Sequence, residues 1–210
     1  MNKRIILYSV AILFLIGIGS YFFPSSLQVT QVRTNTNHNV STEELSRVKN
    51  LFQKNNIDLG TLAITSVKID EQGASHIRAE QFYKNLPIFL GGQIIYHFDS
   101  SGKALVDSTN PDGTNHIYIS GERIGNLGIS TEPSISAPTA VRTARESMKS
   151  NYFFTAELGF WDLTAGTSNT ESNFVLVWRI KPKGADQYPY AIIDANTGKL
   201  IRYWNGIIIN

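Results

Sequence analysis

Cysteine is absent from the sequence. Its absence excludes disulfide bonds, a cysteine nucleophile, thiolate metal sites and the lipid-bearing N-terminal cysteine of bacterial lipoproteins. An excess of one charge is lacking as well, because Lys3 and Arg4 supply the formal net charge of +2 and the rest of the chain is balanced. A balanced chain offers no general basic surface, so binding to nucleic acid is not expected.

The motifs of common catalytic sites are also missing. None of the four histidines has a second histidine three to five positions after it, so the His-Glu-x-x-His helix of zinc proteases is absent. The sequence has no Gly-x-Ser-x-Gly elbow, and the glycines of Gly121 to Gly128 match no nucleotide-binding spacing. A metal site joining His76, His97 and a distant carboxylate would depend on the fold, whereas a lone strand histidine is usually a surface or core group. We therefore predict no catalytic residue, no metal and no cofactor, and a protein that is not an enzyme.

The composition predicts a folded protein with a packed core. Of the 210 residues, 42% are hydrophobic and 17% are charged, which is too apolar for a disordered chain. Since domains commonly contain about 100–150 residues, this length allows one large domain or two small ones. We expect two.

The longest apolar run lies near the N-terminus. It extends from Ile5 to Phe23, follows the basic pair and stops at Pro24. Such a run is typical of a signal peptide or of a membrane anchor, for which about 17–25 residues suffice. A cleaved signal usually ends in a site of small residues, and Gly17 to Ser20 is the segment most similar to such a site. The sequence favours a hydrophobic helix retained as an anchor within residues 1–23 over a cleaved signal, and a buried core helix is a weaker alternative.

Residues 24–40 are a polar spacer, after which the pattern becomes regular. Ser41 and Glu44 have the spacing of a capping box, and apolar residues then recur at helical spacing as far as Asn55. Asp99 to Lys103 has the composition of a tight hairpin turn. Alternation with a period of two predicts strands around this turn and before it, at 62–69, 75–83, 93–99, 104–107 and 116–120.

The second half repeats this plan. Ser136 is placed to cap a helix whose first turn contains Pro138, and Asp194 to Lys199 is a close analogue of the earlier turn. Strands are predicted at 153–163, 174–180, 190–194 and 200–204. The expected fold is therefore α+β, with two small helix-plus-antiparallel-sheet units in tandem after an N-terminal hydrophobic helix. The domains are expected at 41–120 and 136–210, with a linker at 121–135.

The stretch from His76 to Gln93 resembles the signature of the fungalysin/thermolysin propeptide motif. The matching pattern runs His, an apolar residue and Arg, then Gln-x-Tyr, then Pro and a glycine pair, and His97 to Gly102 continues it. The sequence departs from the family at Asn85-Leu86, where a glycine and a small apolar residue are usual. Phe89-Leu90 also increases the number of residues between Pro87 and the glycine pair Gly91-Gly92.

The second half resembles the PepSY domain that follows in the same propeptides. The similar segments are residues 135–140, 176–180 and 193–201. Propeptides of thermolysin-like proteases dock against the catalytic domain and block its cleft, and this order of domains implies two cystatin-like units of that kind. The resemblance implies a non-catalytic module that binds, inhibits or assists the folding of an exported thermolysin-like zinc metalloprotease in trans.

Two surfaces are candidates for the partner. They comprise Leu86, Pro87, Ile88, Phe89, Tyr203, Trp204, Ile207 and Ile208. The same residues also have a structural interpretation, as a turn or bulge at a sheet edge and as aromatics packed on a pleated face. Two other functions stay open: a membrane-anchored envelope module that binds a protein unrelated to proteases, and a truncated relic of a protease precursor. In each case the folded part is expected outside the cytoplasm, anchored through residues 5–23 or secreted after cleavage.

Overall fold

The computed structural model describes residues 40–206, except positions 112, 114, 151, 169, 170, 186 and 187. The predicted anchor at residues 1–23 and nearly all of the polar spacer lie outside the described residues. Among the helices that are described, none combines the length and the apolar content that crossing a membrane requires. Within the described residues the fold is α+β, with two helices and mostly antiparallel strands.

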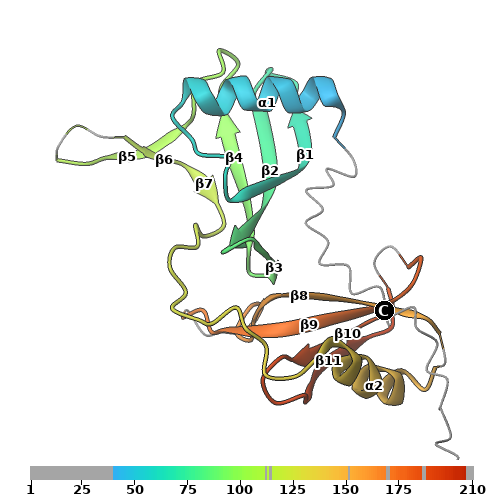
Figure 1. Ribbon diagram of the computed structural model, residues 1–210. Coiled ribbons are helices and arrows are strands. Elements are labelled where there is room, and N and C mark those ends of the chain that lie inside the picture. Colours follow the sequence, from blue (N-terminus) through green and yellow to red (C-terminus); the bar gives the residue numbers. More distant parts are fainter. Residues whose placement is uncertain are drawn as a thin grey trace, which may run out of the picture.

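The first half is a helix laid over an antiparallel sheet, as the sequence predicts. Helix α1 (Thr42–Lys54) crosses strands β1 (Leu62–Ile69), β2 (Ser75–Tyr83) and β4 (Gln93–Phe98), as seen in Figure 1. The capping box is formed, because the Ser41 hydroxyl accepts from the Glu44 N–H and the Glu44 carboxylate accepts from the Ser41 N–H. The largest fully buried side chains between helix and sheet are Val48, Phe52, Ile77, Ile94, Tyr96 and Phe98.

A hairpin leaves this sheet where the sequence predicted a continuing strand. Ala104 makes only a single bridge to Phe98, and the chain then turns away as β5 (Val106–Thr109), paired with β6 (Asn115–Ile117). The predicted strand at 104–107 is therefore shifted. The predicted strand at 116–120 is split into β6 and β7 (Ile119–Ser120), because the Tyr118 N–H donates to the Leu105 carbonyl at the base of the hairpin. Only β7 returns to the sheet, next to β4.

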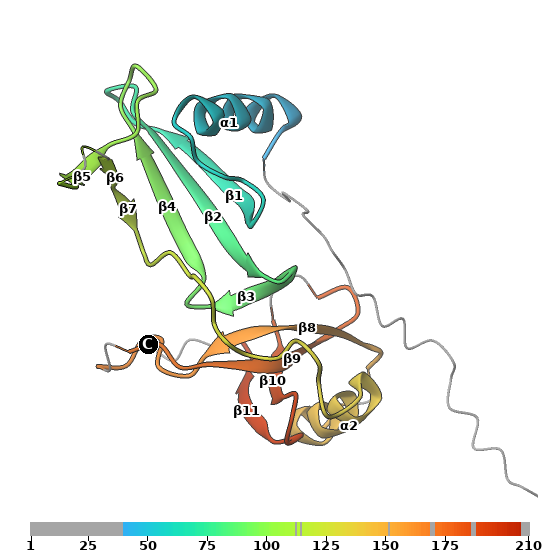
Figure 2. The same ribbon diagram turned by 60° about the vertical axis from the view of Figure 1, so that its left-hand side comes forward.

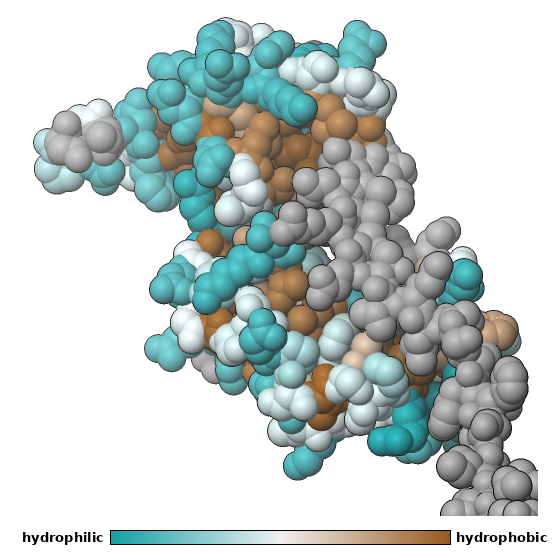
Figure 3. Space-filling model, viewed as in Figure 1, coloured by the Kyte–Doolittle hydropathy of each residue, from teal (hydrophilic) through white to brown (hydrophobic). Residues whose placement is uncertain are grey.

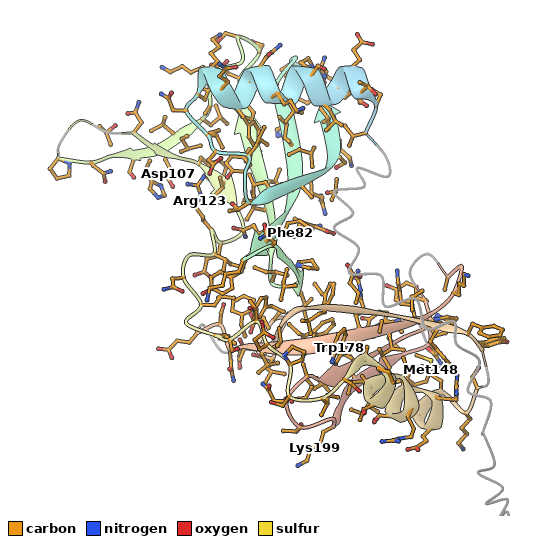
Figure 4. The ribbon with its side chains drawn as sticks, viewed as in Figure 1. Phe82, Asp107, Arg123, Met148, Trp178 and Lys199 are labelled. Carbon is orange, nitrogen blue, oxygen red and sulfur yellow. The ribbon has the colours of Figure 1, made fainter. Side chains whose placement is uncertain are left out.

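The second half confirms its predicted elements closely. Helix α2 (Ala137–Met148) covers one face of β8 (Phe154–Asp162), β9 (Phe174–Pro182), β10 (Tyr190–Asp194) and β11 (Leu200–Trp204). Ser136 is at the N-cap position, but its hydroxyl contacts the Thr139 hydroxyl instead of capping a backbone N–H. The indole of Trp178 lies on the α2 side of the sheet and donates to the Ile135 carbonyl at 3.1 Å (Figure 4).

One further strand, β3 (Leu86–Leu90), joins the two sheets. It pairs antiparallel with the end of β2 and parallel with β8, so the hydrogen-bonded path runs β11-β10-β9-β8-β3-β2-β4-β7, with β1 beside β2. Figure 2 shows β3 lying between the sheets, each of which has its own helix. The fold therefore contains a strand-to-strand junction that the expected plan of two tandem units did not include. The description of these units as cystatin-like stays a prediction.

Candidate protein-interaction site

The turn that leads into β3 explains how the sequence departs from the propeptide pattern. Lys84 and Asn85 both have positive φ, 48° and 66°, and connect Tyr83 to its pairing partner Leu86. A two-residue hairpin loop with positive φ at both positions matches the twist of its strands, and asparagine adopts this conformation more readily than most residues. Asn85 therefore preserves the backbone that the usual glycine provides.

Strand β3 is not a free edge, contrary to the expectation for Leu86 to Phe89. Its first residues pair with Phe82 and Tyr83, and its later ones pair with Phe160 and Trp161 of β8. Ile88 is only 3% exposed and packs into the core beneath α2. Leu86, Pro87 and Phe89 are half-buried. Partner binding by these four residues stays a prediction, and it would have to use the exposed parts of three half-buried side chains.

Close packing at Gly159 permits the β3–β8 pairing. A Cβ placed on this glycine would lie 2.5 Å from the Phe89 ring and 2.6 Å from the Pro87 carbonyl oxygen. The guanidinium of Arg179 covers the Phe89 ring at 3.9 Å from its centroid and forms an ion pair with Glu157. Only a residue without a side chain lets the two backbones approach in this way.

The second predicted surface, at the end of β11, is divided between the two faces of the second sheet, because Tyr203 is opposite Ala191 on the α2 side and Trp204 is opposite Tyr190 on the far side. Tyr203 is 40% exposed, and Trp204 is half-buried beneath the Arg202 guanidinium, 4.7 Å from the ring centroid. The rings of Tyr188 and Tyr190 stack at 5.7 Å, and Tyr188 also contacts the Trp204 ring at 6.3 Å. This group is the aromatic patch: Tyr188, Tyr190 and Trp204. Ile207 and Ile208, predicted as part of the same surface, lie outside the described residues.

The two predicted surfaces are not brought together. Four strand-to-strand steps separate β3 from β11, and at about 4.8 Å a step they are roughly 19 Å apart. β11 ends the hydrogen-bonded path, and within the described residues it pairs with β10 alone. An end strand presents unpaired backbone donors and acceptors, so the β11 edge and its aromatic patch are the better candidate for binding an extended partner segment.

Two residues of the propeptide signature hold the linker against the first sheet. The buried Gln81 side chain donates to the Glu122 carbonyl at 2.8 Å and accepts from the Ile124 N–H at 2.9 Å. The Tyr83 hydroxyl donates to the Asn126 side chain at 2.6 Å. Nearby, Arg123 donates to the Tyr96 hydroxyl (Figure 4). These residues therefore have a structural role that sequence reasoning did not identify.

An open hollow lies between this linker and the loop that leads into β9. Its volume is about 470 Å³, and its lining is formed by residues 122–127, Ile129 and residues 172–174. Its lining includes two charged residues, Glu122 and Arg123. Figure 3 shows that the apolar residues on this side of the molecule gather beneath α1 and over the second sheet, whereas polar side chains cover the outer side of α1.

A chain of four polar side chains crosses the face of the first sheet that is remote from α1. His76 and His97 are paired in register on β2 and β4, and their Nδ1 atoms lie 2.8 Å apart. His76 Nε2 contacts Asp70 Oδ2 at 3.2 Å, and His97 Nε2 contacts the Ser120 hydroxyl at 2.9 Å. The fold thus unites the residues that a metal site would have needed. However, Asp70 contacts His76 Nε2, whereas His97 contacts His76 Nδ1, so the three side chains do not converge on one ion. The described residues contain no group of side chains that could bind a metal.

Comparison with known proteins identifies one family motif. The model of the Fungalysin/Thermolysin Propeptide Motif matches residues 60–106, which contain β1 to β4. This motif is a propeptide region and not a catalytic one. Among solved structures, the Bacillus megaterium YpeB C-terminal domain aligns with 14% identity and a TM-score of 0.37, covering 80% of this chain and 66% of that chain. No curated protein matches the sequence.

Proposed function

We propose that this protein is a non-catalytic, propeptide-like module that binds an exported thermolysin-like zinc metalloprotease in trans and inhibits it or assists its folding. The match of residues 60–106 to the propeptide motif carries this proposal. The polar signature residues Gln81 and Tyr83 hold the linker, and Asn85, which replaces the usual glycine, forms the turn. A segment organised in this way acts through its shape, which suits a protein that binds another protein.

The second half is proposed to be a PepSY-like unit, with domains at residues 41–120 and 136–210. In this arrangement the β11 edge would pair with an extended segment of the protease, and the aromatic patch would pack against apolar side chains beside it. Aromatic side chains that keep one face in solvent are common anchors at protein interfaces. The N-terminal run is proposed to export the chain and hold it at the membrane through residues 5–23, or to be cleaved so that the module is released.

Inhibition of a thermolysin-like protease from the same organism is the direct test. The full chain, purified in mild detergent, should slow peptide cleavage in a saturable manner or raise the yield of refolded protease. The double variant Tyr203→Ala/Trp204→Ala should weaken inhibition by at least about tenfold, because interface anchors of this type contribute about 2 kcal/mol or more. A matched control is Tyr152→Ala/Phe153→Ala, since these aromatics are 66% and 63% exposed and lie before β8. If the full chain neither inhibits nor assists the protease at micromolar concentrations, the proposal is wrong.

The open β11 edge also fits a second candidate, an anchored envelope module that pairs with a protein unrelated to proteases. Cross-linking from a photoreactive residue placed at position 203 distinguishes the two. Cross-links to a thermolysin-like protease support the first proposal, whereas a single non-protease product supports the second. A relic of a protease precursor would give neither product.

A further inference from the structure

The hydrogen-bond chain Asp70–His76–His97–Ser120 allows only one assignment of donors and acceptors when both imidazoles are neutral. Asp70 carries no proton, so His76 must donate from Nε2, which leaves its Nδ1 as an acceptor. His97 then donates from Nδ1 to His76, and its own Nε2 accepts from the Ser120 hydroxyl. Every member of the chain is satisfied in this arrangement, which joins the turn after β1 to β2, β4 and β7.

A first added proton preserves the chain. It charges His76, beside the Asp70 carboxylate: the Nδ1–H of His76 then donates to His97 Nδ1, and His97 donates from Nε2 to the Ser120 hydroxyl, which reverses its role and accepts. The two Nδ1 atoms stay hydrogen-bonded, and Asp70 is the counter-charge of His76.

A second proton cannot be accommodated. It must bind His97 at Nδ1, where it would face the Nδ1–H of His76 across 2.8 Å. The hydrogen bond is then lost, and two imidazolium cations are in contact. The neighbouring charges do not relieve this repulsion fully: Lys68 of β1 is opposite His76 in register, Arg78 is next on the same face of β2, and Asp70 is the one carboxylate bonded to the chain.

The histidine pair also holds the base of the projecting hairpin. The Tyr118 ring stacks on the His97 imidazole at 5.0 Å between centroids, and the Ser120 contact fixes β7. β7 pairs with β4 at only two positions, Ile95 with Ser120 and Tyr96 with Ile119. Strands β5 and β6 project beyond it as a two-stranded ribbon (Figure 1), with Asp107 on the ribbon (Figure 4). A ribbon of two strands has little stability of its own, so its orientation depends on this base.

We propose that the His76–His97 pair is a proton-controlled latch: it keeps β7 and the β5–β6 hairpin on the first sheet with zero or one proton bound, and releases them when both histidines are protonated. Burial lowers the pKa of His97, and a charge on His76 lowers it further, which is consistent with a reluctant second protonation. The unfolded chain binds both protons below about pH 6.5, whereas the latched state binds one. The latch therefore weakens as the pH falls below that value. The equilibrium constant for its closing falls by up to about tenfold for each pH unit that separates the pKa of the second protonation in the released state from that in the latched state.

Hydrogen exchange on the full chain tests this latch. Amide protection of residues 115–121, corrected for the intrinsic pH dependence of exchange, should fall between pH 7.5 and pH 5, whereas protection of α2 should not change. His76→Gln removes one of the two sites of protonation, so the pair can no longer bind two protons, and the variant should abolish the acid-dependent loss. His116→Gln is the matched control, because His116 is a histidine of the same hairpin but contacts Asp107 instead of the four hydrogen-bonded side chains. This variant should retain the loss.

A measurement on the unmodified protein keeps the test independent of whether the variants fold. Nitrogen-15 spectra of the imidazoles should show His76 and His97 titrating in two linked steps separated by more than about one pH unit. Equal, independent titration of the two rings would overturn the latch. Unchanged protection of residues 115–121 at pH 5, or the same acid-dependent loss in His76→Gln as in the wild type, would overturn it as well.

Discussion

The junction between the two sheets depends on close packing at Gly159, and Gly159→Ala tests whether this contact holds the halves together. The added methyl group would lie 2.6 Å from the Pro87 carbonyl oxygen, whereas ordinary contact begins at 3.4 Å, so the backbones must separate by about 0.8 Å. The Phe89 ring, 2.5 Å from the same position, can rotate only by leaving the Arg179 guanidinium. The backbone oxygen has no such freedom.

The expected loss of stability follows from these contacts. Overpacking of this kind costs about 1–3 kcal/mol, and each weakened β3–β8 hydrogen bond adds about 0.5–1.5 kcal/mol. Alanine restricts the unfolded chain more than glycine does, which offsets about 0.5–1 kcal/mol. A net destabilisation of about 2 kcal/mol would lower the Tm by about 4–8 °C for a chain of this size.

Thermal unfolding followed by tryptophan fluorescence suits this test, because Trp161, Trp178 and Trp204 all lie in the second sheet. Gly125→Ala is the matched control: nothing lies within 4 Å of its Cβ position and its φ is not positive. If Gly159→Ala unfolds at the same temperature as Gly125→Ala, the close packing of β3 on β8 is refuted. A partial recovery of Tm on adding Phe89→Leu would show how much of the loss comes from the ring.

Substitutions at three further positions test local features by urea unfolding. Asn85→Gly should raise the free energy of unfolding by a few tenths to about 1 kcal/mol and Asn85→Val should lower it by about 1–2 kcal/mol, because the backbone there has positive φ; equal stability of the two variants would contradict this. Ser41→Ala should cost about 1 kcal/mol through loss of the capping box with Glu44, measured as a lower urea midpoint at unchanged m-value. Burial raises the pKa of Asp162, but hydrogen bonds from Thr164 and Asn173 outweigh it and bring the pKa below its usual range. Its stabilisation is therefore present above about pH 4 and lost as the pH falls further, and Asp162→Asn should show a smaller change in urea midpoint between pH 6 and pH 3 than the wild type.

The sequence by itself determined the features that depend on near neighbours. Apolar periodicity located both helices and the four strands of the second sheet, since each pattern lies within one element. The turns at Asp99 and Asp194 also follow from local chemistry, because each carboxylate accepts backbone N–H bonds within its own loop and each loop has a glycine with positive φ.

Tertiary structure alone decided the junction and the polar chain. Whether Leu86 to Leu90 is an edge or an interior strand depends on β8, about 70 residues away, and no local pattern encodes that pairing. His76 and His97 looked isolated because their contact arises from the register of two strands, and Ser120 joins them only after the hairpin has left and returned. Propensity and periodicity act over a few residues, whereas strand pairing is selected by the packing of the whole chain. Which strands pair, and in which register, is therefore decided only in the folded molecule.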